Sequence, residues 1–62
     1  MVASGSRWYH GSIAAEVIVT AGDHEGRTVV VFEYIVWYGD QEIRIAQTML
    51  LSDWFRTMKG PP

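Results

Sequence analysis

The sequence predicts a mainly β fold, a small antiparallel meander of about four strands with one short C-terminal helix. Three features of the 62 residues support this prediction. Residues 29–38 are almost all β-branched or aromatic, and such residues favour a pleated strand. The Gly39-Asp40 pair that follows is typical of a two-residue hairpin turn. Beyond Gln47 the apolar residues recur at helical instead of alternating spacing, so the last element is a helix.

The first half of the chain contains two shorter strand signals. Residues 1–6 are expected to form a flexible leader, since they are mostly small. Two adjacent aromatic residues within 7–10 indicate an edge strand, and the β-branched segment 13–20 predicts a second strand. Residues 21–27 hold two glycines and a run of polar residues, which is typical of a loop.

The third strand, 29–38, is apolar on both of its alternating faces, so it must be covered on both sides. After the turn, residues 41–47 alternate, with Ile43 and Ile45 on one face and polar residues on the other. This alternation predicts a fourth, half-exposed strand.

The tail of the sequence predicts a short amphipathic helix. Thr48 or Ser52 is expected to cap its start, and residues 59–62 supply a basic last turn, a glycine and two prolines that end it. We expect the apolar side of this helix to cover the sheet, and binding of a partner by the helix is the alternative. The apolar residues at helical spacing are Leu50, Leu51, Trp54, Phe55 and Met58.

Composition limits the classes of function. The chain is short enough for a single domain, 1–62, and without cysteine it has no disulfides. A net charge of −2 gives no basic surface for phosphates, so no nucleic-acid partner is expected. No apolar run is long enough to span a membrane, and no signal peptide is recognisable, so the predicted location is cytoplasmic without membrane association.

Strand pairing divides the apolar residues between the two faces of the sheet. The turn fixes the register of the last two strands, and apolar residues are expected to meet across the preceding pair. The face predicted to form the core carries Ile13, Ala15, Val17, Val19, Val30, Phe32, Tyr34, Val36, Ile43 and Ile45. The other face is predicted to form an interface with another chain, because a monomer seldom exposes so broad an apolar patch. Its large apolar residues are Ile18, Val29, Val31, Ile35 and Trp37.

The same register predicts a buried charge cluster of Glu16, Glu33 and Arg44. Glu16 is expected directly opposite Glu33, with Arg44 on the adjoining strand. Two neighbouring carboxylates repel, so either the guanidinium bridges them or one keeps its proton. An acid/base pair is the functional interpretation. An arginine-bridged structural cluster is favoured, because no nucleophile, metal ligand or phosphate loop lies near in the sequence.

No catalytic residue, metal site or cofactor is predicted. His10, Asp23, His24 and Glu25 are metal-ligand types, but no histidine pair has helical spacing. A glycine-bounded loop with alternating charges is more often simply solvated. Trp8, Tyr9, Trp37 and Tyr38 would line an aromatic groove for a peptide if the strand ends converge, and core packing is the commoner use of such residues.

Two segments of the chain resemble known families. The order V-I-V-T-A-G-D-H-E-G-R-T-V-V-V over 17–31 resembles the strand, glycine loop and strand of KOW and other SH3-like small β-barrel domains. It covers about a quarter of the chain and implies an SH3-like barrel; the basic character of those modules is missing here. Glu16-Val17-Ile18, Tyr38-Gly39-Asp40 and Met49 resemble in spacing a short bacterial domain family of unknown function, which implies no activity.

These observations predict a non-enzymatic small β-barrel interaction module. It is expected to form a homodimer or higher homo-oligomer and to bind a protein partner, because its second face is apolar and its core is small. The alternative is a ligand-binding or catalytic oligomer whose site forms between subunits around Glu16, Glu33, Arg44 and Trp37. A solvated cleft at the cluster would favour chemistry, and a dry, fully paired contact would favour structure.

Overall fold

The computed structural model describes residues 2–60, which fold into one antiparallel sheet and a helix. The strand order is β1-β2-β3-β4, so each strand pairs with its neighbour in sequence. The predicted meander with a C-terminal helix is therefore confirmed. The elements are β1 (Arg7–His10), β2 (Ile13–Gly22), β3 (Thr28–Tyr38), β4 (Gln41–Leu50) and α1 (Leu51–Thr57).

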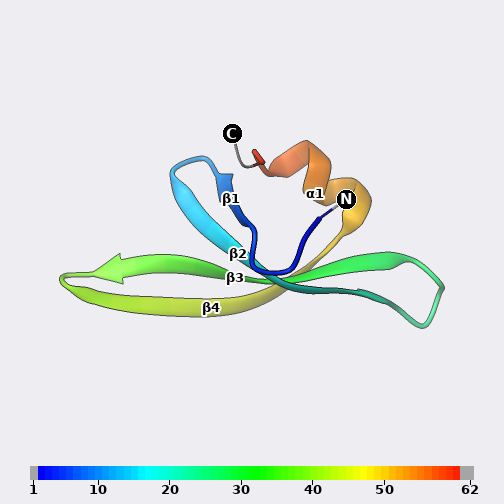
Figure 1. The fold of residues 1–62 in the computed structure, drawn as a ribbon, viewed down its shortest axis with the longest axis horizontal. Coiled ribbons are helices and arrows are strands. Elements are labelled where there is room, and N and C mark those ends of the chain that lie inside the picture. The colour runs from blue at the N-terminus through cyan, green and yellow to red at the C-terminus, as the bar shows by residue number, and fades with distance from the viewer. Residues whose placement is uncertain (1, 61–62) are drawn as a thin grey trace.

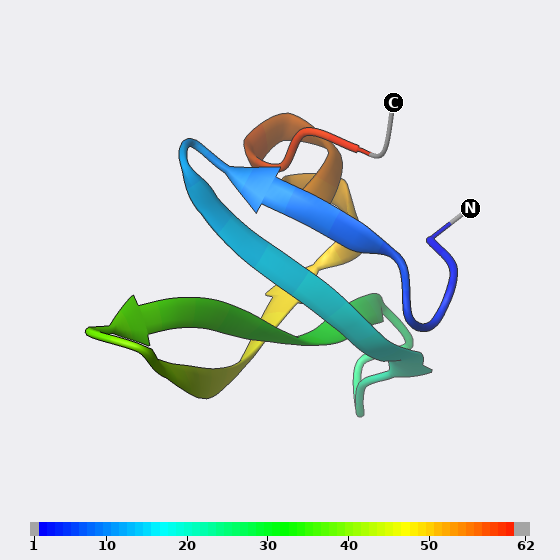
Figure 2. The same cartoon turned by 60° about the vertical axis from the view of Figure 1, so that its left-hand side comes forward.

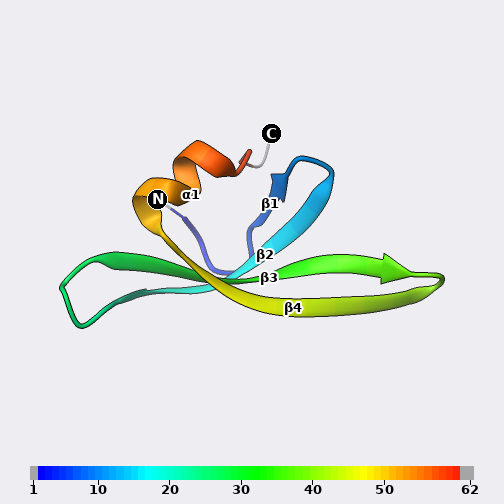
Figure 3. The same cartoon turned by 180° about the vertical axis from the view of Figure 1, so that it is seen from behind.

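The sheet is strongly twisted and elongated. β3 and β4 form one long ribbon, and the molecule measures 40 × 24 × 16 Å. Figure 1 shows the β1–β2 hairpin and α1 on the same side of this ribbon, and Figure 3 shows the same arrangement from behind. In Figure 2, β2 passes obliquely across the ribbon. The β3–β4 turn lies at the end of the ribbon away from α1, so the helix leaves that end uncovered.

The β3–β4 hairpin has the predicted register over its whole length. Ten residue pairs run without a shift from Val29↔Leu50 to Tyr38↔Gln41. Gly39 has a φ of 66°, whereas Asp40 does not take a positive φ. This fits a primed turn of type II′, in which only the first central residue needs positive φ. β4 continues three residues beyond the predicted end at Gln47.

The β2–β3 register is as predicted only up to Val17. Val17 pairs with Phe32, and Glu16 pairs with Glu33. A bulge between Val17 and Val19 then shifts the register, so that Val19 pairs with Val31 instead of Val30. A bulge adds one residue to its strand and thereby reverses the faces beyond it. The prediction that Val19 faces the core was wrong for this reason, and Val19 is exposed.

The core lies between the middle of the sheet, α1 and the N-terminal segment. Val2 is buried in it, the amide of Gly5 donates to the carbonyl of Val17, and the amide of Val17 donates to the carbonyl of Ser6. The segment expected to be a flexible leader therefore contacts the sheet through the side chain of Val2 and the backbones of Gly5 and Ser6. Met1 lies outside the described residues. The buried core consists of Val2, Ala15, Val17, Val30, Phe32, Trp54 and Met58.

The core is shorter than the sequence pattern predicted. Ile13, Ile43 and Ile45 were assigned to it, but each is 40–43% exposed. They belong to the ends of the two hairpins, beyond the part of the sheet that the helix and the N-terminal segment cover. Ile35 differs from the prediction in the opposite direction. Alternation places it on the second face, yet it is buried. It does not belong to the core cluster.

Helix α1 covers the sheet as predicted, but its ends differ from the prediction. Its N-cap is Leu50, and no side chain caps it, so neither Thr48 nor Ser52 has that role. The helix ends because Met58 is extended and its side chain is buried, while the backbone of Lys59 pairs with Tyr9 of β1. The proline pair at 61–62, expected to stop the helix, lies outside the described residues. No helix within residues 2–60 is long and apolar enough to cross a membrane.

Trp54 attaches the helix to the sheet. Its side chain is fully buried, and its ring packs edge-on against Trp8 and Phe32, with centroids 5.5 and 4.8 Å apart. Edge-to-face aromatic pairs at this separation are favourable beyond their buried area. The helix thus acts as a lid on the sheet, as the sequence pattern indicated.

Candidate functional site

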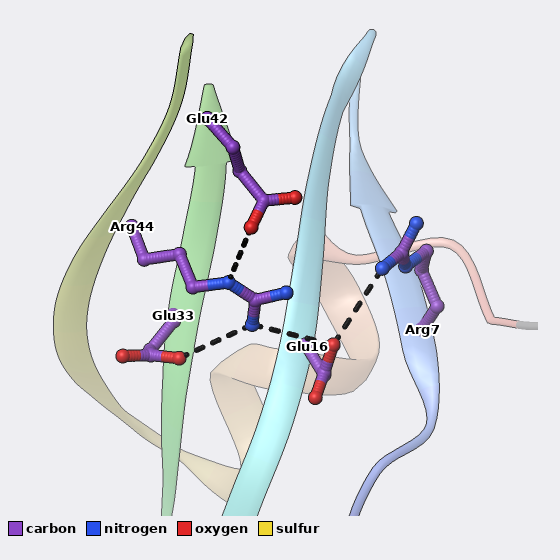
Figure 4. A network of polar contacts seen from close by, with 5 residues as sticks. All are labelled: Arg7, Glu16, Glu33, Glu42 and Arg44. Atoms are coloured by element: carbon purple, nitrogen blue, oxygen red, sulfur yellow. Dashed lines mark hydrogen bonds and ion pairs between the residues drawn. The ribbon is translucent and has the colours of Figure 1, made fainter. Parts of the chain in front are cut away.

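A charged cluster crosses the second face of the sheet, opposite α1. It takes at least one residue from every strand, and pairing aligns Arg7 with Glu16 and Glu16 with Glu33. Arg44 lies diagonal to Glu33, two residues along β4 from the directly opposite position, because β4 places Ala46 opposite Glu33 and Arg44 opposite Ile35. The charged cluster consists of Arg7, Glu16, Glu33, Glu42 and Arg44 (Figure 4).

Arg44 is the centre of this cluster. Its Nη1 lies 3.4 Å from Glu16 Oε1 and 3.3 Å from Glu33 Oε1, and its Nε donates to Glu42 Oε2 at 3.0 Å. Arg7 Nη2 approaches Glu16 Oε1 from the other side at 3.5 Å. The sequence pattern correctly predicted that Glu16, Glu33 and Arg44 come together. It missed Glu42 and Arg7, although the register that located Arg44 also places Glu42 on the same face, two residues before it.

The cluster is partly exposed and not buried as predicted. The side chains of Glu16 and Glu33 keep 29% of their surface accessible and that of Arg44 keeps 33%. Hydrogen bonds to Glu42 and Glu33 raise the pKa of the Arg44 guanidinium above its already high ordinary value. Arg44 is therefore a permanent cation. The cluster has three carboxylates and only two guanidiniums, so its charges do not cancel. Partial exposure to water explains why this excess negative charge is tolerated.

The carboxylates of Glu16 and Glu33 are both engaged in ion pairs. A general acid or base needs a substrate position within hydrogen-bond reach. The carboxylates of Glu16 and Glu33 instead share a guanidinium, and no cavity opens anywhere among residues 2–60. The contacts are those of an ion-pair network that links strands.

The glycine loop between β2 and β3 is stabilised by hydrogen bonds among its own residues. Asp23 Oδ1 accepts the backbone N–H groups of Glu25 at 2.9 Å and Arg27 at 2.8 Å, and Asp23 Oδ2 accepts Arg27 Nε at 2.9 Å. These bonds lower the pKa of Asp23, the largest effect being that of the Arg27 backbone N–H. No group of three potential ligands among the described residues could hold a metal ion.

The five apolar residues predicted to form an interface have different surroundings. Ile35 is buried, and Val29 and Val31 are half-buried, so little of their surface is free. Ile18 lies at the bulge of β2 and is exposed. Trp37 is 65% exposed near the end of the ribbon. The fold therefore limits the free apolar surface to fewer residues than the pattern indicated.

The two most exposed large apolar side chains among residues 2–60, Trp37 and Tyr38, lie at the end of the β3–β4 ribbon. Trp37 and Tyr38 end β3, with Tyr38 77% exposed, and Ile43 and Ile45 follow on β4. Trp8, expected to line an aromatic groove with Tyr9, Trp37 and Tyr38 if the strand ends converge, packs against Trp54 and Phe55. We call Trp37, Tyr38, Ile43 and Ile45 the hairpin tip.

β4 also forms a free edge of the sheet. The other edge, β1, is partly covered, since the backbones of Tyr9 and Lys59 exchange two hydrogen bonds of 2.9 and 2.8 Å. Residues 41–48 of β4 are all exposed, and no backbone hydrogen bond among the described residues reaches their outer side. Sequence alternation indicated a half-exposed strand but could not show that it lies last in the sheet.

Comparison with known proteins gives no assignment: no family model, no curated protein and no solved structure matches this chain.

Proposed function

We propose that this protein is a non-enzymatic β interaction module that self-associates and binds a protein partner through the exposed end of its sheet. The observation that carries the proposal is the hairpin tip, where four large apolar side chains stand exposed next to a free strand edge. Trp37 lies on the second face of the sheet, and Tyr38, Ile43 and Ile45 lie on the face that carries the core. Exposed apolar surface on both faces of one strand end favours an interaction site there, because soluble monomers seldom leave large apolar areas in water.

The small core supports the same proposal. Seven buried residues within 2–60 form the core cluster, and two of the seven lie outside the sheet and the helix. A domain of this length buries only about 60% of the surface of its unfolded chain, so association adds stability that the core alone does not provide. Covering the hairpin tip would bury apolar surface that folding leaves in water.

The charged cluster has a supporting role in this proposal. Its ion pairs connect all four strands, and its carboxylates lack the cavity that substrate binding requires. We therefore assign it to holding the strands in register next to the interaction surface, and not to chemistry.

The proposal is tested by light-scattering mass after size exclusion on two matched variants. Trp37→Ala removes an exposed aromatic ring from the hairpin tip. Phe55→Ala removes one from the helix, where Phe55 is 54% exposed. We expect Trp37→Ala to shift the oligomer toward monomer and Phe55→Ala to leave it unchanged, both with native circular dichroism. Equal masses for both variants and the unmodified chain would contradict the role of the hairpin tip.

A further inference from the structure

We infer that two copies of this chain pair antiparallel through their β4 edges, with Ile43 on the two-fold axis and Glu42 opposite the partner's Arg44. This inference rests on the proposed self-association and specifies its geometry. It joins two four-stranded sheets into one continuous sheet of eight strands.

Apart from two charged side chains, the β4 edge lacks the features that normally block strand addition. Proteins protect such edges with prolines, bulges, short strands or a covering segment. β4 is ten residues long, contains no proline, and pairs with β3 without any register shift. Its charged side chains are Glu42 and Arg44, which have opposite signs and are two residues apart on one face.

The hairpin determines which backbone groups face outward. Tyr38 and Gln41 flank a two-residue turn, so they form the hydrogen-bonded pair that closes it. Hydrogen-bonded and non-bonded pairs alternate along an antiparallel ladder. The backbone groups of Ile43 therefore point toward β3, while those of Glu42 and Arg44 point toward the open edge. A strand that pairs with this edge must bond to Glu42 and Arg44.

The charged side chains of β4 determine which register of the β4–β4 pair is favoured. With Ile43 on the axis, Glu42 and the partner's Arg44 form a hydrogen-bonded pair, and symmetry repeats it on the other side. Opposite charges directly across a strand pair are favourable, and like charges are unfavourable. This register gives each Glu42 a second guanidinium, in a cluster where three carboxylates have two cations.

Neighbouring symmetric registers fit less well. A two-fold axis at Arg44 would place two guanidiniums directly opposite each other. An axis at Ile45 would bring the partner's turn beside Leu50 and Leu51, where the chain leaves the sheet for α1 and is no longer fully exposed. The axis at Ile43 uses only the segment around 40–46, which is exposed throughout.

Single-cysteine variants test this register directly, because the chain has no cysteine of its own. In the proposed dimer, Ile43→Cys places two Cα atoms about 4.5 Å apart in a non-bonded pair, within disulfide range. Ile45→Cys is the matched control on the same strand and face, with nearly equal exposure. In this register its two copies lie four residue steps apart, roughly 13 Å, which a disulfide cannot span.

We expect Ile43→Cys, and not Ile45→Cys, to form a disulfide dimer in a glutathione buffer, as seen on a non-reducing gel. Preferential crosslinking of Ile45→Cys, or equal crosslinking of both, would overturn the register. A dimeric unmodified chain with no Ile43→Cys crosslink would overturn the register and leave self-association standing. A monomeric unmodified chain would overturn both.

A charge reversal provides a second test that needs no cysteine. Glu42→Arg would place two cations opposite each other across the β4 pair, so we expect the dimer dissociation constant to rise about tenfold or more. Glu25→Arg makes the same change in the β2–β3 loop, away from this edge, and should leave the constant unchanged. Equal constants for both variants would contradict the assigned pairing.

Discussion

Glu16 and Glu33 lie directly opposite each other on β2 and β3, and one nitrogen of Arg44 contacts both carboxylates. Like charges at directly opposed strand positions destabilise a sheet unless a cation lies between them. Arg44 supplies that cation from the next strand. The strand register therefore places Glu16 opposite Glu33. The sheet tolerates this pair of like charges because Arg44, which follows the β3–β4 turn, lies between them.

Arg44→Met should destabilise the fold at neutral pH. The substitution keeps an apolar stem of similar length but leaves Glu16 and Glu33 without the guanidinium they share. The loss should diminish as the pH is lowered into the range where carboxylates take up protons, because protonation removes the repulsion. Thermal unfolding followed by circular dichroism from neutral to acidic pH measures this.

Glu16→Gln in the Arg44→Met background is the matching control. It removes one of the two opposed charges, so much of the stability lost at neutral pH should return. If the double variant is as unstable as Arg44→Met alone, the repulsion between Glu16 and Glu33 is not the cause.

Trp54→Ala should leave the protein largely unfolded. Truncating a large buried aromatic residue typically costs about 3–5 kcal/mol, close to the whole stability of a small domain. Trp54→Phe should cost much less, because it keeps an aromatic ring and removes an Nε1–H group that has no acceptor among residues 2–60. Urea unfolding of both variants tests this, and native stability in Trp54→Ala would show that the helix is not a lid.

Gly60→Ala should be destabilising, although Gly60 lies beyond the helix. A Cβ there would lie 2.9 Å from Cζ3 of Trp8, whose half-buried ring packs on Trp54. Forcing such overlap typically costs about 1–3 kcal/mol. Gly22→Ala is the control, since its Cβ meets nothing within 4 Å and its φ is not positive. We expect that change to be neutral or to stabilise by about 0.4–1 kcal/mol. Equal unfolding midpoints for the two variants would contradict this packing.

The Asp23 loop should add stability that depends on pH. Hydrogen bonds, chiefly from the Arg27 backbone N–H, hold the folded pKa of Asp23 below its unfolded value. A lowered folded pKa means that the contribution is fully present above about pH 4 and is lost as the pH falls through the folded value. Asp23→Asn should therefore reduce stability at neutral pH and have little effect in strong acid. Asp40→Asn removes the same charge from the other turn, where the carboxylate accepts no such hydrogen bonds within residues 2–60, and serves as the charge control.

The sequence predicts those parts of the structure that depend on residues close together along the chain, and it does not predict contacts between the two ends of the chain. Alternation in β3 and the Gly39-Asp40 turn are local, so they predicted the strands and the β3–β4 register. The contact of Glu16, Glu33 and Arg44 also needed the β2–β3 register, which was predicted by pairing apolar with apolar residues. The bulge at Val17/Val19 follows no local signal, and it reversed the face of Val19. Burial of Val2 and the pairing of Lys59 with Tyr9 join the two ends of the chain, which periodicity within one segment cannot indicate.

The same limit applies to the candidate site, where local alternation predicts some features and not others. Side-chain alternation predicted that Trp37 and Ile35 share a face, but alternation within β3 does not show that Trp37 is exposed and Ile35 is buried. The free edge at β4 likewise depends on strand order, which the pattern within each strand does not define.

Sedimentation equilibrium of the unmodified chain over the micromolar range decides whether the protein self-associates. Self-association predicts an apparent mass that rises with concentration from the 7.0 kDa of one chain toward at least twice that value. The melting temperature should rise with concentration in parallel, because association stabilises the folded state. A constant mass of 7.0 kDa, with a melting temperature independent of concentration, would contradict self-association and the interface built on it.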